Sequence, residues 1–63
     1  MKVSQYYIGQ KVVGRNSGST VEIISLTTFE VTVRYLKSRE IHIYGIYDFP
    51  NRFIIKDDSE YIL

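Results

Sequence analysis

Five short runs rich in β-branched residues lie between Lys11 and Lys56, and they constrain the fold more than any other feature. In the runs at 21–24 and 29–35 the apolar residues recur at every second position, as a strand with one buried face requires. We therefore expect an all-β fold, a small five-stranded antiparallel barrel. The strands are expected near residues 10–14, 20–25, 29–35, 39–44 and 53–56.

Two turns set the expected register of the middle strands. If residues 26–28 and 36–38 form these turns, the inner-face pairs are Ile23 with Val31, Val21 with Val33, Val33 with Ile41 and Val31 with Ile43. Both hairpins then place Val31 and Val33 on the inner face. A slip of one residue would turn such a set of side chains toward water.

The alternation breaks after Gly45, where the segment 46–53 has neither the period of a strand nor the length of a stable helix. Pro50 would also remove a donor from any ladder that it entered. A single 3₁₀ turn before the last strand is the structure expected for this segment.

Four strands, a 3₁₀ turn and a closing strand follow the order found in SH3-like barrels. The stretch from Gly9 to Lys56, about three quarters of the chain, resembles the small SH3-like barrels that include Tudor-like and KOW-like modules. The likeness to KOW modules rests on Lys11-Val12-Val13, Gly18 and Val21. The resemblance implies a five-stranded SH3-like barrel and a binding function.

The length of 63 residues predicts a single domain over 1–63, with a core at 9–56, a lead-in at 1–8 and a tail at 57–63. The carboxylates Asp57, Asp58 and Glu60 are expected in a solvated tail, because they lack the spacing and the glycine of a calcium loop. No signal peptide or membrane-spanning run is apparent, and the chain has no Cys. A soluble cytoplasmic protein is expected.

The inventory of reactive side chains predicts that the chain is not an enzyme and uses no cofactor or metal. His42 is the single histidine, no thiol is present, and no set of nucleophile, base and orienting acid can be assembled. The expected register places His42 on the outer face opposite Thr32, where a lone histidine is usually a bystander. On the same face, Arg34 is expected to pair with Glu40.

Apolar residues at expected solvent positions favour a protein partner. The register places Ile24 beside Tyr44, flanked by Leu26 and Ile46, which predicts an exposed protein-binding patch. Coverage of that patch by residues 6–8 or by the tail is the alternative. The favoured function is therefore a non-enzymatic protein–protein interaction module. Such a module would act as an adaptor, an assembly subunit or a small inhibitor, as many small phage or mobile-element proteins do.

Nucleic-acid binding, RNA or DNA, is the alternative function. The net charge of only +1 gives it little support, but basic and aromatic residues are expected around the rim of the barrel. These residues are Arg15, Lys37, Arg39, Tyr47 and Arg52. The Tudor-like resemblance also implies a possible aromatic cage for a methylated cation, made of Tyr35, Tyr44, Tyr47 and Phe49 with Asp48. A structural homo-oligomer is a third class.

Overall fold

The computed structural model of the chain describes residues 6–55, which form one sheet and one short helix. The elements in order are β1 (Lys11–Gly14), β2 (Thr20–Leu26), β3 (Glu30–Tyr35), β4 (Ile41–Gly45), α1 (Phe49–Arg52) and β5 (Phe53–Ile55). All strand pairs are antiparallel. The all-β prediction is confirmed, and each described strand end lies within two residues of its expected position. Residues 1–5 and the predicted tail lie outside the described residues.

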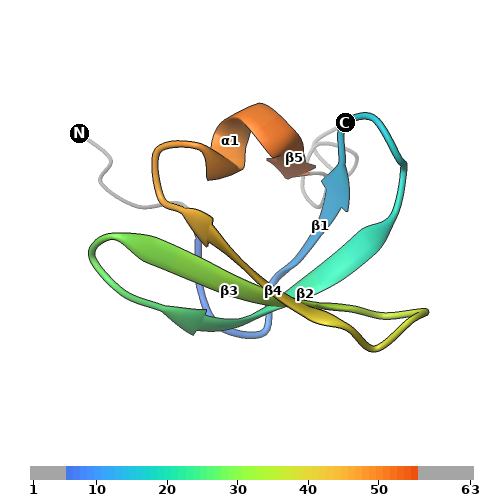
Figure 1. The fold of residues 1–63 in the computed structure, drawn as a ribbon, viewed down its shortest axis with the longest axis horizontal. Coiled ribbons are helices and arrows are strands. Elements are labelled where there is room, and N and C mark those ends of the chain that lie inside the picture. The colour runs from blue at the N-terminus through green and yellow to red at the C-terminus, as the bar shows by residue number, and fades with distance from the viewer. Residues whose placement is uncertain (1–5, 56–63) are drawn as a thin grey trace, which may run out of the picture.

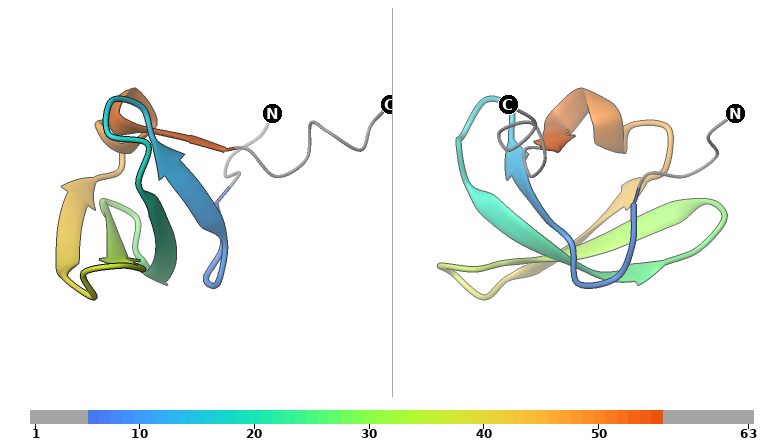
Figure 2. Two further views of the ribbon diagram at one scale, coloured as in Figure 1. Left: turned by 90° about the vertical axis from the view of Figure 1, so that its right-hand side faces the viewer. Right: turned by 180° about the vertical axis from the view of Figure 1, so that it is seen from behind.

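The five strands form an open sheet in the order β4-β3-β2-β1-β5. Figure 1 shows the central strands on one side of the molecule, with α1 and β5 on the other. The sheet curls strongly, so that α1 lies over one end of its concave face (Figure 2). Within residues 6–55 no pairing joins β4 to β5, and the expected closure of the barrel is therefore not shown.

Helix α1 occupies the segment for which a 3₁₀ turn was predicted. The N–H of Phe53 donates to the carbonyl of Phe49, four residues earlier, which is the α-helical spacing. Pro50 lies in the first turn, where its missing N–H costs no intrahelical bond. The predicted 3₁₀ turn is therefore not confirmed, although a helical turn does precede the last strand.

Seven apolar side chains form the core between the sheet and α1. They are Val12, Val21, Ile23, Val31, Val33, Phe49 and Phe53, all 5% exposed or less. The rings of Phe49 and Phe53 stack with centroids 4.7 Å apart, so that α1 and β5 close the core from above. This core includes the four valine and isoleucine residues of β2 and β3 that alternation placed on the inner face.

The register of β2 against β3 differs from the predicted one by two residues. Ile23 pairs with Val33 and Val21 with Tyr35, and the ladder is irregular between Ile23 and Ser25. An extra residue in one strand is the signature of a β-bulge. Because side chains alternate with period two, a shift of two residues changes the partners but keeps the same side chains inside.

The register of β3 against β4 differs from the predicted one by one residue. This shift exchanges the inward and outward side chains of β4. Val33 pairs with His42 and Val31 with Tyr44, so that the predicted pairs with Ile41 and Ile43 are wrong. The cause is a four-residue turn. It closes between Tyr35 and Glu40, and Arg39 adopts a positive φ of 70° within it. The prediction assumed a three-residue turn at 36–38.

This exchange changes both faces of the sheet. Ile41 and Ile43 are 57% and 60% exposed, whereas Tyr44 packs against the core. The outer face of β4 is therefore apolar, and its inner face carries a histidine and a tyrosine.

Candidate functional site

The first candidate surface is a cleft between α1, the β1–β2 turn and the inner face of β3 and β4. Its volume is about 360 Å³, and its lining includes Arg15, Tyr35, Tyr44, Asp48, Asn51 and Arg52. We call it the tyrosine–arginine cleft. Two tyrosines enter it because the register turns Tyr44 inward, beside Tyr35 from the neighbouring strand.

The polar groups of the cleft are bound to one another. The hydroxyl groups of Tyr35 and Tyr44 lie 3.0 Å apart in a hydrogen bond. Arg52 donates from Nε to Asp48 Oδ2 over 2.5 Å, an i,i+4 pair across the single turn of α1. The Arg52 guanidinium also lies 5.6 Å from the centre of the Tyr44 ring, within cation–π range.

Burial and hydrogen bonding shift the ionisation of this group. Burial, followed by the hydrogen bond with Tyr35, raises the pKa of Tyr44 to about 12. The hydrogen bond with Asp48 raises the pKa of Arg52. Tyr44 is therefore neutral and Arg52 charged at neutral pH.

The raised pKa of Tyr44 predicts a loss of stability in alkali. Below the ordinary tyrosine pKa of 10 both states of the chain hold the proton, so Tyr44 adds no pH dependence. Above pH 10 the unfolded chain releases the proton while the folded chain retains it until about pH 12, so the free energy of unfolding falls across this interval. Urea unfolding of wild type and Tyr44→Phe at a series of pH values should show a shallower alkaline fall in the variant. Identical slopes would contradict the assignment.

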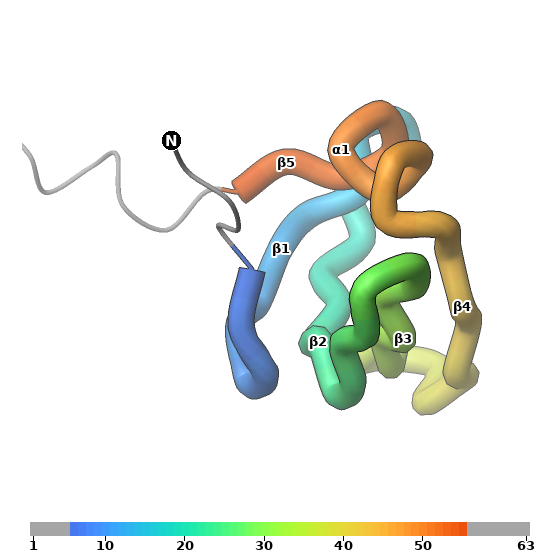
Figure 3. The backbone as a smooth tube through the Cα atoms, turned by 90° about the vertical axis from the view of Figure 1, so that its left-hand side faces the viewer, coloured from blue at the N-terminus to red at the C-terminus, as the bar shows by residue number. Residues whose placement is uncertain are grey.

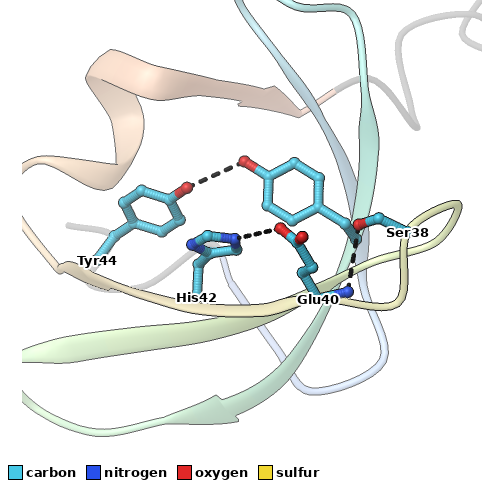
Figure 4. A network of polar contacts seen from close by, with 5 residues as sticks. Ser38, Glu40, His42 and Tyr44 are labelled. Carbon is cyan, nitrogen blue, oxygen red and sulfur yellow. Dashed lines mark hydrogen bonds and ion pairs between the residues drawn. The ribbon is translucent and has the colours of Figure 1, made fainter.

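His42 lies on the inner face, and the predicted position opposite Thr32 on the outer face is wrong. Figure 4 shows His42 beside Tyr44, with its ring directed toward Glu40. The distance from His42 Nε2 to Glu40 Oε1 is 3.1 Å, and the His42 ring meets the Tyr35 ring edge-on with centroids 5.1 Å apart. The one-residue register shift of β4 explains this position, which the sequence alternation did not indicate.

The predicted ion pair between Arg34 and Glu40 is also not formed. Arg34 instead lies across the sheet from Glu22, with Nη2 3.8 Å from Oε1. Both side chains are partly exposed, so the pair contributes at most about 1 kcal/mol.

The second candidate surface is the free side of β4, which we call the β4 edge and define by the backbone and side chains of Ile41 and Ile43. Strand β4 is one of the two edge strands of the sheet, and β5 is the other (Figure 3). The bonds from Tyr35 N–H to Glu40 O and from Ile46 N–H to Phe29 O place the even-numbered residues of β4 toward β3. The N–H and C=O groups of Ile41 and Ile43 therefore point away from β3, and no described residue bonds to them.

The four residues predicted to bind protein do not form one exposed patch. Leu26, Tyr44 and Ile46 all pack against the core. Ile24 is half-buried at the irregularity of β2. Three exposed apolar residues adjoin the predicted patch: Ile43 next to Tyr44, Tyr47 next to Ile46, and Phe29, whose carbonyl accepts a hydrogen bond from the Ile46 N–H.

Residues 6–8 of the lead-in were expected, as an alternative, to cover that patch. Tyr6 packs edge-on against Phe49 with ring centroids 5.1 Å apart. Tyr7 and Ile8 are 56% and 64% exposed. The described lead-in residues therefore leave the β4 edge open.

Of the residues predicted to bind nucleic acid, the structure brings Arg15 and Arg52 together. Both line the tyrosine–arginine cleft, and the Arg15 side chain donates to the Pro50 carbonyl. Lys37 lies in a neighbouring hollow of about 490 Å³ that also reaches Tyr35. Arg39 lines neither hollow, and Tyr47 is 87% exposed outside both.

The predicted aromatic cage is not assembled as expected. Phe49 is fully buried in the core, and the guanidinium of Arg52 already lies over Tyr44. The part of the chain that the structure describes holds no cluster of three or more potential metal-ligating side chains. None of its helices has the length and apolar character needed to cross a membrane.

Comparisons of this chain with protein-family models, with curated proteins and with solved structures found no match.

Proposed function

We propose that this chain is a non-enzymatic protein-interaction module that binds an extended polypeptide segment along the β4 edge. The observation that carries this proposal is the coincidence of unpaired backbone groups with exposed isoleucine side chains at Ile41 and Ile43. Such a module would serve in the cytoplasm as an adaptor, an assembly subunit or a small inhibitor of its partner. The strand order, with a helical turn before β5, supports an SH3-like relationship.

Strand addition explains why this edge suits a protein partner. An incoming strand would bond to the outward N–H and C=O groups, and its alternate apolar side chains would cover Ile41 and Ile43. Soluble proteins usually protect an edge strand with Lys, Pro or a bulge. Strand β4 contains none of these, since its residues are Ile-His-Ile-Tyr-Gly in a continuous ladder.

A capture experiment with three baits tests this proposal. Tagged wild type, Ile43→Lys and Ile8→Lys are incubated with nuclease-treated lysate of the source cells, and the retained proteins are identified by mass spectrometry. Ile8 is a matched control because it is 64% exposed, against 60% for Ile43, and lies outside the strands. Wild type and Ile8→Lys should retain a stoichiometric protein that Ile43→Lys loses. Equal retention by all three baits would contradict the proposal.

Nucleic-acid binding in the tyrosine–arginine cleft is the second candidate. It is favoured by the convergence of Arg15 and Arg52 beside two tyrosine rings, a combination suited to phosphate contact and base stacking. It ranks second because Asp48 lies in the same cleft and already pairs with Arg52. Under this candidate, binding would weaken with salt and with Arg15→Gln, but not with Ile43→Lys.

A further inference from the structure

We propose that the strand added to the β4 edge is β4 of a second copy of this chain, in an antiparallel arrangement about a two-fold axis beside His42. This inference rests on the proposed function, because it names the partner of the same edge. A two-fold contact of this kind requires one strand to be complementary to itself. The backbone, the side chains and the charges around β4 each meet that requirement.

The backbone requirement is met by Ile41 and Ile43. With the axis beside His42, Ile41 of one copy lies opposite Ile43 of the other, and each pair exchanges both backbone hydrogen bonds. An axis beside Ile43 would instead require Gly45 to pair with Ile41. The Gly45 carbonyl already accepts a hydrogen bond of 3.0 Å from the N–H of Asp48, which favours the axis at His42.

The side-chain requirement is met on the outer face of the sheet. Ile41 and Ile43 project there from both copies and would form one continuous apolar row across the axis. They are more than half exposed in the single chain, so association would remove their apolar surface from water. The paired sheets would also satisfy the backbone groups of the edge that no described residue satisfies.

The charge requirement selects the antiparallel direction. The segment before β4 carries Lys37, Arg39 and Glu40, a net charge of +1, whereas Glu30 lies opposite Gly45 at the far end of the strand. Within residues 6–55 Lys37, Arg39 and Glu30 form no ion pair, whereas the Glu40 carboxylate lies 3.1 Å from His42 Nε2. Antiparallel copies place the basic end of each β4 against the acidic end of the other, whereas parallel copies would place like charges together.

Sedimentation equilibrium over a range of protein concentrations tests the association. Wild type and the matched control Ile8→Lys should show a reversible monomer–dimer equilibrium. Ile43→Lys should raise the dissociation constant at least about tenfold, because a lysine would replace the isoleucine that pairs with Ile41 of the other copy. Circular dichroism checks that the exposed substitutions leave the fold intact. A wild type that remains monomeric, or a dimer unaffected by Ile43→Lys, would overturn the proposal.

Cysteine cross-linking tests the position of the axis, since the chain has no cysteine of its own. The proposed register places His42 of the two copies directly opposite each other in a non-hydrogen-bonded pair, where side chains lie closest. Under mild oxidation His42→Cys should form a covalent dimer much faster than Ile8→Cys. Faster cross-linking of Ile43→Cys would overturn the register.

These results separate the inference from the proposed function. A monomeric wild type that still captures another protein through Ile43 would reject self-pairing and leave strand addition to a different partner. A monomeric wild type without Ile43-dependent capture would reject both. A dimer that depends on Ile43 and cross-links through position 42 would support both.

Discussion

Replacing Phe49 with Ala should cost about 3 to 5 kcal/mol of folding stability, the range for removing a large aromatic side chain from a core. Phe49 is fully buried, and its ring contacts those of Tyr6, Tyr44 and Phe53. Helix α1 has only four residues, so it has few other contacts with which to hold its position. A chain of 63 residues has a total stability of roughly 3 to 9 kcal/mol, and most or all of it would be lost.

Tyr47→Ala is the matched control for this substitution. Tyr47 is aromatic and only two residues away, but it is 87% exposed. Its replacement should change the free energy of unfolding by no more than about 0.5 kcal/mol. Urea unfolding of the three proteins, followed by far-ultraviolet circular dichroism, measures both effects. Equal losses for the two variants would mean that α1 does not close the core as described.

The second large effect concerns the two faces of the sheet. Ile23→Ala should cost about 2 to 5 kcal/mol, because Ile23 is fully buried in the core. Ile43→Ala should cost less than about 1 kcal/mol in the monomer, because that side chain is 60% exposed. The two substitutions remove the same atoms, so most of the difference between them comes from burial.

Urea unfolding at low protein concentration makes this comparison, since dilution removes any contribution from association. The register predicted from the sequence makes the opposite statement about Ile43, which it places inside against Val31. A loss for Ile43→Ala as large as that for Ile23→Ala would restore the predicted register and contradict the structure.

The contrast between the two hairpins shows which part of the fold was predictable. Alternation identified the buried side of β2 and β3. The predicted register was wrong by two residues, but the buried side chains were still predicted correctly because the side-chain period is two. The turn before β4 was one residue longer than assumed, with Arg39 at a positive φ. An arginine in the sequence does not indicate a positive φ as a glycine would. On alternation alone, Ile41-His42-Ile43 is interpreted as a pair of inward-facing isoleucines.

The wrong register of β4 also made the predicted protein-binding patch wrong. The predicted patch depended on Tyr44 lying on the outer face, and the one-residue shift replaced it there with Ile41 and Ile43. Arg15, Tyr47 and Arg52 were all expected around the rim of the barrel, and of these Arg15 and Arg52 line the cleft whereas Tyr47 does not. The pairing of Asp48 with Arg52 was missed, although their i,i+4 spacing was a usable signal.

The most direct test of an open, self-pairing β4 edge is amide hydrogen exchange, followed residue by residue by nuclear magnetic resonance at two protein concentrations. In dilute protein the amides of Ile41 and Ile43 should exchange rapidly, whereas those of His42 and Tyr44, which face β3, should be protected. At high concentration Ile41 and Ile43 should become protected as well. Exchange at these two amides that stays rapid at every concentration would contradict pairing through β4, and protection already complete in dilute protein would show that the edge is not open.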